Sequence, residues 1–451
     1  MALLTKAPRG TQDVPPKESA QWQTVERVTS ETAEHYGYRE IRTPVFEHTE
    51  LFHRSVGETT DVVQKEMYTF EDKGGRSITL RPEGTAGAAR AMLEHAMYND
   101  GLPVKVYYHT SCYRYEKPQA GRLREFHQFG IECFGAAEPA ADAEIICLAD
   151  SIFASLGVEG LKLEINSIGC PTCRAEYSKA LREYFSGHAD ELCETCRGRL
   201  ERNPMRILDC KSPVCAEIAA HAPVMLDYLC DDCKAHFEQV KSYLTAAGLH
   251  FSVNPTIVRG LDYYTRTVFE FVSTQIGAQG TVCGGGRYDG LIDELGGAHT
   301  PSLGFALGME RLLLLMNAQG ITLPDPDPCD LYIAGLGARA QVEAFALTQK
   351  VRSEGFAAEC DICGRSLKAQ MKYANKIGAR FTLVLGDTEL DTGRAQLKNM
   401  ATGEQREIEL AQLISCMYDA RFAATLDNLT ELDGVSGDAA GLLGKLTGNQ
   451  Q

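Results

Sequence analysis

The segment from Val104 to Gly135 most constrains the fold, because it has the pattern of two strands joined by a charged loop. Side chains alternate in type over 104–108 and again over 126–134, the two-residue period of a β-strand. A solvated hairpin tip would explain the charges of the loop, but charges extend inward to Arg114 and Glu132, beside aromatic residues. A charge within an apolar sheet is costly unless it is paired or meets a ligand. The segment therefore favours a site for a polyanion.

The length of the chain predicts several domains and a sizeable core. It has 451 residues, of which 44% are hydrophobic, and this length suggests about three domains. No run of about 18 apolar residues occurs, so we expect no membrane span. The first residues, MALLTKAPRGTQDVPP, contain too short an apolar run for a secretory signal. We therefore expect a cytoplasmic protein.

The charge balance limits how the chain can bind nucleic acid. It carries 45 Lys and Arg against 61 Asp and Glu, a net charge of −16. This argues against a protein that coats nucleic acid through bulk charge. Any RNA binding has to come from local basic patches.

Four segments resemble the ordered motifs of one known family. YRYEKPQAGRLREFHQFGIECFG, which includes the second strand, is similar to motif 2 of class II aminoacyl-tRNA synthetases, in the form found in the histidine–tRNA ligase family. Thr79–Thr85, Val258–Phe271 and Gly304–Leu312 match further motifs of that family, so the resemblance covers almost the whole chain. Tyr38–Val45 is similar to motif 1, which implies a homodimer built at this edge.

The resemblance also implies the domain organisation. We expect an α+β catalytic core on an antiparallel sheet over 1–325, with a helical, cysteine-rich insertion at 170–250. A C-terminal α/β anticodon-binding domain would cover 329–425, followed by a tail at 426–451. The residues alone place the clearest boundary at the stiff, acidic linker Pro324–Pro328. Beyond it an α/β pattern follows, with strand signals at Asp330–Leu336, Ala357–Ile362 and Phe381–Gly386.

Three arginines are the expected catalytic residues. By resemblance, Arg114 binds the α-phosphate of ATP and the substrate carboxylate, a task that suits a bidentate guanidinium. Arg259 would stabilise charge on the α-phosphate during attack, and Arg311 would meet the γ-phosphate. For ATP, the resemblance adds Phe126 stacked on adenine and Arg122 near the distal phosphates. Ordinary polarity of a mobile loop is an equal alternative for Arg122.

The resemblance also assigns an amino-acid pocket. Glu83 would pair with the α-ammonium of histidine, supported by Thr85, although a turn that leads into a helix would also explain this segment. Glu132 could accept a hydrogen bond from the imidazole, and Tyr264 would bond it, with Tyr263 alongside. Strand period places Gln128 and Glu132 on one face. The expected substrate-binding set is Glu83, Gly84, Thr85, Arg114, Gln128, Glu132, Arg259, Tyr263 and Tyr264.

Eight cysteines lie within the expected insertion. They form three pairs with two-residue spacers and one pair with a four-residue spacer, the spacing of zinc knuckles. Eight thiols can complete two tetrahedral sites, and we predict structural zinc; the alternative is a reduced, metal-free helical insert. The family resemblance gives zinc no support. The candidate ligands are Cys170, Cys173, Cys193, Cys196, Cys210, Cys215, Cys230 and Cys233.

One cation stripe is a candidate RNA contact. A helix expected over Arg365–Arg380 carries five cations spaced by three or four residues and no carboxylate, namely Arg365, Lys368, Lys372, Lys376 and Arg380. A solvated basic face is the alternative to a contact with the tRNA backbone. Gln119 matches a loop residue of the family that meets the acceptor end of tRNA, although plain loop polarity would explain it equally well.

The implied reaction is ATP-dependent ligation of L-histidine to its tRNA, through histidyl-adenylate, with Mg²⁺ required by the ATP chemistry. There are two alternatives, the first from a different functional class. A non-catalytic regulatory paralogue generally lacks the C-terminal domain and parts of the motifs, all of which this chain has. A ligase for another amino acid is disfavoured because an aliphatic substrate would leave Glu132 and Tyr264 unpaired.

Overall fold

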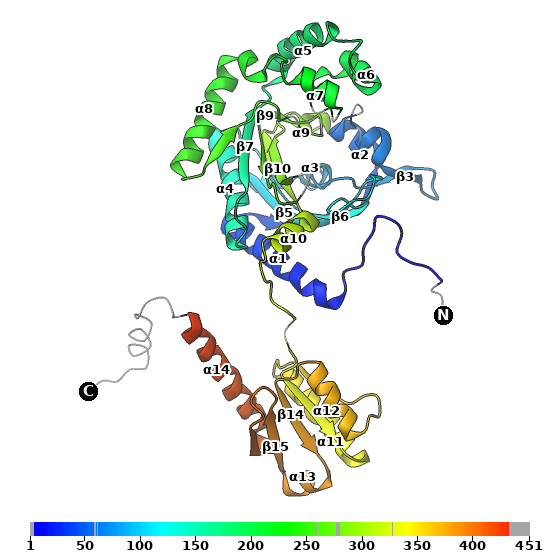
Figure 1. Cartoon of the computed structure of the whole chain (residues 1–451), viewed down its shortest axis with the longest axis vertical. Helices are drawn as coiled ribbons and strands as arrows, with labels where there is room; N and C mark the ends of the chain where they lie inside the picture. The colour runs from blue at the N-terminus through cyan, green and yellow to red at the C-terminus, as the bar shows by residue number, and fades with distance from the viewer. Residues whose placement is uncertain are drawn as a thin grey trace, which may run out of the picture. The chain divides into compact units, whose positions relative to one another are not determined.

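The computed structural model describes residues 4–57, 60, 62–208, 210, 212–257, 259–276, 280–326 and 328–432. The chain divides into two compact units, Met1–Asp325 and Pro326–Gln451 (Figure 1). Within the described residues, no helix combines the length and the apolar character that a membrane span requires.

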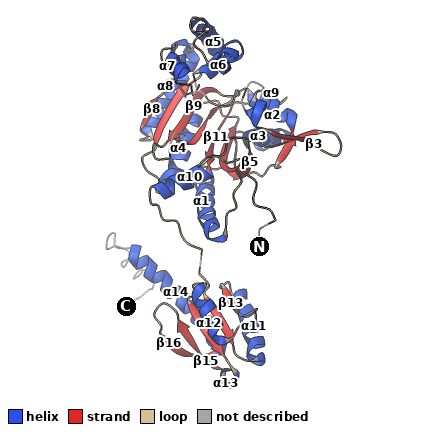
Figure 2. Ribbon diagram, turned by 45° about the vertical axis from the view of Figure 1, so that its right-hand side comes forward, coloured by secondary structure: helices blue, strands red, loops and turns tan. Residues whose placement is uncertain are grey.

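An eight-stranded sheet forms the centre of the first unit (Figure 2). Its strands, in spatial order, are β1 (Arg39–Glu40), β5 (Val104–Tyr113), β6 (Glu125–Phe134), β11 (Ser302–Gly308), β10 (Thr281–Arg287), β9 (Thr265–Val272), β7 (Lys162–Ser167) and β8 (Phe251–Val253). The pairs from β5 to β7 are antiparallel, and the edge strands β1 and β8 pair in parallel with their neighbours. The predicted α+β fold on a mainly antiparallel sheet is confirmed.

The predicted hairpin is the pair β5 and β6, in register from Val104 opposite Phe134 to Tyr113 opposite Glu125. Because successive side chains of a strand point to opposite faces, Phe129, Ile131 and Cys133 of β6 pack in the main core. That core also contains residues of α1 (Pro16–His35), α4 (Pro139–Ser155) and α10 (Met309–Ala318). The side chains at the even-numbered positions of β6 point to the opposite face of the sheet.

The opposite face is covered by a second cluster. Helix α3 (Thr85–Glu94) packs there on Val106 and Tyr108 of β5, together with Tyr263, Tyr264 and Tyr288. A small antiparallel sheet leads into α3; its strands are β2 (Phe46–His48), β4 (Ser77–Leu80) and β3 (Tyr68–Glu71). The remaining elements of this part are α2 (Thr49–Val56), η1 (Val62–Glu66), η2 (Met97–Asp100) and α9 (Leu291–Glu294).

The expected insertion is helical and has its own small core, which is rich in cysteine. Its elements are α5 (Pro171–Ser186), α6 (Glu194–Arg202), η3 (Pro204–Ile207), α7 (Pro213–Ala219), η4 (Met225–Tyr228) and α8 (Asp231–Ala246). The far end of α8 packs in the main core through Phe237, Val240 and Leu244. Strand β8 ends at Val253, and Pro255, which has no N–H to donate to a ladder, follows two residues later.

The second unit is an α/β domain on a five-stranded sheet. The three predicted strands are present as β12 (Leu331–Gly335), β13 (Ala358–Cys360) and β14 (Phe381–Leu385), and they pair in parallel. Strands β15 (Arg394–Asn399) and β16 (Gln405–Glu409) add a hairpin that was not predicted. The helices and the short turn η5 are α11 (Ala338–Ser353), α12 (Leu367–Lys376), α13 (Asp387–Thr392), η5 (Leu410–Gln412) and α14 (Leu413–Leu432). The expected tail at 426–451 therefore starts within α14, and residues 433–451 lie outside the described part.

Candidate active site

The second face of the sheet holds a cavity of about 240 Å³. Strands β6, β10 and β11, the loop of the β5–β6 hairpin, and the segment before β9 contribute to its lining. Arg114, Arg259 and Arg311, which lie far apart in the sequence, all line it. The three arginines predicted to be catalytic are therefore brought together.

Arg311 lies in the first turns of α10, directed at the hairpin loop. Its Nη1 donates to the carbonyl of Thr281 at 2.8 Å, and its Nε donates to the carbonyl of Gly121 at 3.2 Å. Burial, and then the positive charges of Arg122 and Arg114, lower the pKa of Arg311. Guanidinium groups that repel one another in a buried cavity form a site for an anion with several negative charges.

The β5–β6 hairpin contributes Arg114 and Arg122 to the same group of cations. Arg114 donates from Nε to the carbonyl of Pro82 at 2.8 Å, and its guanidinium lies 5.3 Å from the ring centroid of Phe126. Arg122 forms an ion pair with the buried Glu116. Arg122 and Phe126, the two residues predicted to bind ATP along with Arg311, line the same cavity.

Arg259 is fixed by a carboxylate that the sequence did not single out. Its Nη1 pairs with Glu270 of β9, which also accepts a hydrogen bond from the hydroxyl of Thr281 at 2.7 Å. A Cβ at Gly284 would lie 2.5 Å from that Nη1, so the guanidinium needs a glycine beneath it. Burial alone lowers the pKa of Arg259, but Tyr264 and Glu270 outweigh burial and raise it.

Tyrosine side chains also line the cavity, and the guanidinium of Arg259 lies 5.6 Å from the ring centroid of Tyr264. Tyr263 and Tyr264 both line it, with ring centroids 4.7 Å apart, and Tyr288 packs edge-on against Tyr263. Gln128 also lines the cavity and accepts a hydrogen bond from the thiol of Cys112 at 3.3 Å.

Glu132 lies one layer behind the cavity wall, rather than pointing into the cavity as expected. It is 1% exposed, and its carboxylate accepts hydrogen bonds from the hydroxyls of Tyr108, at 2.9 Å, and Tyr288. Only the absence of a side chain at Gly304 leaves room for it, because a Cβ there would lie 2.1 Å from Glu132 Oε2. Burial raises the pKa of Glu132 to about 8.

Glu83 lines the cavity, but its carboxylate also caps α3. The backbone N–H groups of Thr85 and Ala86 each donate to one of its oxygens at 2.8 Å. The alternative explanation of this segment, a turn that leads into a helix, is thus confirmed. Thr85 also lines the cavity. Gly84 does not; the ring of Tyr108 lies 2.3 Å from where its Cβ would be, so Gly84 serves close packing.

Two further carboxylates line the cavity, Glu116 and Glu310. Glu310 accepts hydrogen bonds from His127, at 3.0 Å from the backbone N–H and at 2.8 Å from Nδ1. The only sequence signal for Glu310 was its position directly before Arg311, and Glu116 had none. Gln119 does not line the cavity; it is exposed at the hairpin tip, where its backbone pairs with that of Arg122.

The sequence model of histidyl-tRNA synthetase matches residues 10–312, more than half of the chain. The chain belongs to the histidyl-tRNA synthetase family. It is 57% identical over 411 residues to the histidine–tRNA ligase of Caldanaerobacter subterraneus subsp. tengcongensis, covering 91% of this chain and 99% of that protein. The corresponding protein of Acetivibrio thermocellus is 55% identical, covering 92% and 99%.

Solved structures and the second unit agree with this family. The apo histidyl-tRNA synthetase of S. aureus is 43% identical, with a TM-score of 0.80, and the match covers 92% of this chain and 100% of that chain. A model of an anticodon binding domain matches residues 330–418. The resemblance noted in the four motifs is therefore confirmed.

The cation stripe of this family member is shorter than predicted. Helix α12 begins at Leu367 and ends at Lys376, so Arg365 and Arg380 lie outside it. Arg365 pairs with Asp361 at 2.9 Å, and Arg380 pairs with Asp330 at 3.4 Å. The prediction of five cations on one helix was wrong, because it ignored the acids that come before the helix and before β12. The exposed cations that remain on α12 are Lys368, Lys372 and Lys376.

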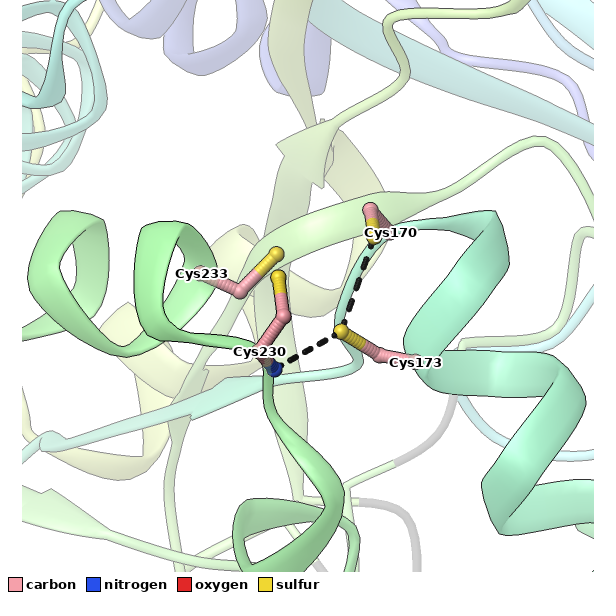
Figure 3. A group of neighbouring side chains, drawn as sticks. All are labelled: Cys170, Cys173, Cys230 and Cys233. Carbon is pink, nitrogen blue, oxygen red and sulfur yellow. Dashed lines mark hydrogen bonds between the residues drawn. The ribbon is translucent and has the colours of Figure 1, made fainter.

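The eight cysteines of this synthetase-family insertion gather into two groups of four. Within each group the sulfur atoms all lie within 4.8 Å of one another. The first group joins Cys170 and Cys173 of α5 to Cys230 and Cys233 of α8 (Figure 3). The second group is made of Cys193, Cys196, Cys210 and Cys215. The sequence predicted two sets of four ligands but not which pairs combine.

Proposed function

We propose that this chain ligates L-histidine to its tRNA in two steps driven by ATP. One observation carries the proposal: Arg114, Arg259 and Arg311 line a single cavity together with Tyr263, Tyr264 and Tyr288. The cationic part has the charge to hold a triphosphate, and the tyrosine part has hydroxyl groups for an imidazole ring.

In the first step, a carboxylate oxygen of histidine attacks the α-phosphorus of ATP. The bond between that phosphorus and the bridging oxygen to the β-phosphate breaks, and pyrophosphate leaves. Arg114 and Arg259 stabilise the charge that develops on the α-phosphate, while Arg311 and Arg122 hold the distal phosphates. Phe126 stacks on the adenine. No side-chain nucleophile is required, so catalysis comes from positioning and charge neutralisation.

In the second step, the 3′-hydroxyl of the terminal adenosine of the tRNA attacks the carbonyl of the adenylate, and AMP leaves. The exposed tip at Gln119 is the part of the hairpin that meets the acceptor end. Lys368, Lys372 and Lys376 contact the phosphate backbone near the anticodon.

The tyrosine side chains of the cavity lining select histidine. Tyr264 bonds the imidazole, and Tyr263 packs beside it. Glu132 contributes indirectly from behind the cavity wall at Gly304, because its carboxylate accepts hydrogen bonds from the hydroxyls of Tyr108 and Tyr288. Glu83 receives the α-ammonium, supported by Thr85, and Gln128 completes the polar lining. An apolar side chain in place of the imidazole would offer the Tyr264 hydroxyl no hydrogen-bond partner.

Mg²⁺ would be held by Glu116 and Glu310, whose carboxylates line the cavity on the side of the arginines. Hard oxygen donors of this kind, few in number and supplemented by phosphate oxygens, suit Mg²⁺. When bound, the ion neutralises charge on the polyphosphate.

Zn²⁺ is the metal proposed for both thiol groups of the insertion. Four thiolates with tetrahedral spacing and no weaker ligand favour Zn²⁺ in a closed, structural site. None of the sixteen cysteines, all of which lie in described positions, forms a disulfide, which fits the proposed cytoplasmic location.

The proposed assembly is a homodimer at the edge strand β1 and the segment after it. Support comes from the motif 1 resemblance and from the exposed apolar residues Val45 and Phe46. The mass of the purified protein in solution, measured by light scattering, checks this part.

The function is tested by ATP–pyrophosphate exchange with each of the twenty amino acids, followed by charging of the histidine tRNA. We expect exchange with histidine alone, and charging of that tRNA. Exchange with a different amino acid, or no exchange at all, would overturn the proposal.

A further inference from the structure

The two thiol groups lie in different places within the insertion. In the first, which we call the root cluster, Cys170 and Cys230 are the N-cap residues of α5 and α8, and Cys173 and Cys233 lie in their first turns. The Cys230 backbone N–H donates to Cys173 Sγ at 3.1 Å. The root cluster therefore joins the start of α5, which follows β7, to the start of α8, whose far end leads back to β8 (Figure 3).

The second group, which we call the distal cluster, closes the far part of the insertion. Cys193 is the N-cap residue of α6, and its backbone N–H donates to the sulfur of Cys215 in α7 at 3.3 Å. The sulfurs of Cys193 and Cys210 lie 3.9 Å apart. The chain between Cys196 and Cys210 forms a loop that the cluster holds at both ends.

Residues next to the root cluster are bonded to the segment Arg259–Arg266, which carries Tyr264. Arg174, the residue after Cys173, donates from Nη1 to the carbonyl of Tyr264 at 3.1 Å. The Arg266 backbone N–H donates to the carbonyl of Gly169, the residue before Cys170, at 2.9 Å. Gly169 has a φ of +65°, and a Cβ there would lie 2.6 Å from Cys173 Cβ, so this turn and the cluster fix each other.

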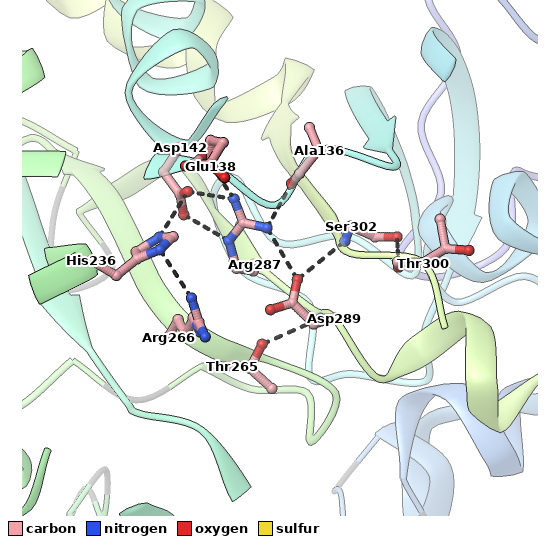
Figure 4. Close-up of polar contacts among 10 residues, drawn as sticks. All are labelled: Ala136, Glu138, Asp142, His236, Thr265, Arg266, Arg287, Asp289, Thr300 and Ser302. Carbon is pink, nitrogen blue, oxygen red and sulfur yellow. Dashed lines mark hydrogen bonds and ion pairs between the residues drawn. The ribbon is translucent and has the colours of Figure 1, made fainter. Parts of the chain in front are cut away.

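Helix α8 brings a second connection from the root cluster to the same segment. His236, one turn after Cys233, faces Arg266 and Asp142 in a buried network (Figure 4). Arg266 Nη1 lies 3.0 Å from His236 Nδ1, and His236 Nε2 lies 3.1 Å from Asp142 Oδ2. Because a guanidinium only donates, Nδ1 accepts and the proton of Nε2 is donated to the carboxylate. Asp142 also pairs with the fully buried Arg287, the residue before Tyr288.

The loop of the distal cluster is bonded to the other end of that segment. Arg206 donates from Nη2 to the carbonyl of Gly260 and lies 3.3 Å from Asp262 Oδ1. Asn203 Nδ2 donates to the same carboxylate oxygen at 3.3 Å. Gly260 follows directly after Arg259. Bonds from the two clusters thus reach the segment at its two ends, the root cluster near Tyr264 and the distal cluster near Arg259.

We infer that the metal-loaded clusters act as two clamps on Arg259–Arg266, so that the insertion is required for activation of the amino acid even without tRNA. This inference rests on the proposed function and on the proposed zinc. Arg174 and Arg206 are the positioning residues that transmit each clamp. The root clamp sets the affinity for histidine through Tyr264, and the distal clamp sets the rate through Arg259.

The test compares Arg174→Ala, Arg206→Ala and the control Arg182→Ala in tRNA-free pyrophosphate exchange. Arg182 lines the same groove as the two positioning arginines, but its side chain donates to the carbonyl of Glu201, within the insertion. We expect Arg174→Ala to raise the KM for histidine at least tenfold with little change in kcat. Arg206→Ala should lower kcat at least tenfold, and Arg182→Ala should change both by less than twofold. Arg174→Lys should partly restore the KM.

Two measurements that do not depend on activity accompany the kinetics. Metal analysis should give two zinc ions per chain in the wild type and in all four variants. Hydrogen exchange of the backbone amides over 259–266 should become faster in Arg174→Ala and Arg206→Ala, and in wild type treated with a zinc chelator. Zinc-loaded Arg174→Ala and Arg206→Ala proteins with wild-type kinetics would overturn the clamps and leave the proposed function intact. Wild type with well under one zinc per chain would overturn the metal, and wild type without histidine-dependent exchange would overturn the function itself.

Discussion

The hydroxyl of Tyr288 donates a hydrogen bond to the carboxylate of Glu132, and so connects the end of β10 to β6 behind the cavity. These two strands are not neighbours in the sheet, because β11 lies between them. Gly304 of β11 pairs with Glu132 in the ladder and has no side chain, so the two groups can meet across it. The missing side chain at Gly304 thus allows the contact between Tyr288 and Glu132.

The first prediction follows from the burial of Glu132. Burial raises the pKa of this carboxyl from 4.5 to about 8 in the folded protein. The folded state therefore binds more protons than the unfolded state between these values, and stability contributed by the protonated carboxyl is lost as the pH rises through this window. Glu132→Gln keeps the shape of the neutral form and cannot ionise.

We expect the melting temperature of Glu132→Gln, relative to that of the wild type, to rise from pH 5 to pH 8.5 in the absence of substrates. Differential scanning fluorimetry in buffers of equal ionic strength measures this difference. A difference that stays constant across the range would show that the carboxyl does not titrate there.

The second prediction concerns Arg259. Arg259→Ala removes a preorganised donor for the α-phosphate, and histidine-dependent pyrophosphate exchange should slow on the order of 10²- to 10³-fold. The matched control is Arg339→Ala in the C-terminal unit, where the arginine forms an exposed pair with Asp391. Unchanged exchange in Arg259→Ala would mean that its assigned role is wrong.

The third prediction concerns close packing at Gly304. In Gly304→Ala the new Cβ would meet the carbonyl oxygen of Ile131 at 2.3 Å, as well as the Glu132 carboxylate. The backbone contact cannot relax by a rotamer change, so we expect a loss of about 1–3 kcal/mol in the free energy of unfolding, with a higher KM for histidine.

Gly198→Ala is the control for this substitution. Gly198 lies inside α6 and its Cβ would have no neighbour within 4 Å, so this change should stabilise the protein by up to about 1 kcal/mol. Urea unfolding of both variants provides the values. Equal stabilities would show that the sheet has more room at Gly304 than the distances indicate.

The fourth prediction concerns the three lysines of α12. Replacing Lys368, Lys372 and Lys376 together by Ala should weaken tRNA binding and reduce the slope of log affinity against log salt by about 2, since each lysine that meets a phosphate contributes about 0.7–0.9. Histidine-dependent exchange should not change. Lys350→Ala, an exposed lysine of α11, should leave the slope unaltered. An unchanged slope in the triple variant would identify α12 as a plain solvated face.

The sequence predicted the parts of the fold that depend on local period and on motif order. The β5–β6 hairpin, the α/β pattern after the linker, and the meeting of Arg114, Arg259 and Arg311 were all predicted. The last of these came from resemblance rather than from residue patterns, because three cations far apart in the chain carry no information about a common cavity.

What the sequence missed has physical reasons. A two-residue period gives the face of a strand but not the depth of a side chain, so Glu132 was placed in the cavity wall instead of behind it. The partners of Arg259 and Arg365, which are Glu270 and Asp361, are set by tertiary contacts and by a turn. The β15–β16 hairpin was missed because its residues are mostly polar and exposed, which gives only a weak strand signal.

The strand order also affects how the protein is made. The β6 edge that carries Gln128 and Glu132 pairs with β11, which is encoded only after the whole insertion. During synthesis on the ribosome, β6 has no partner on this edge while the thiol-rich helices emerge. An unpaired edge is open to association with other chains. The time that the insertion takes to emerge therefore sets how long this edge is open to association with other chains during synthesis.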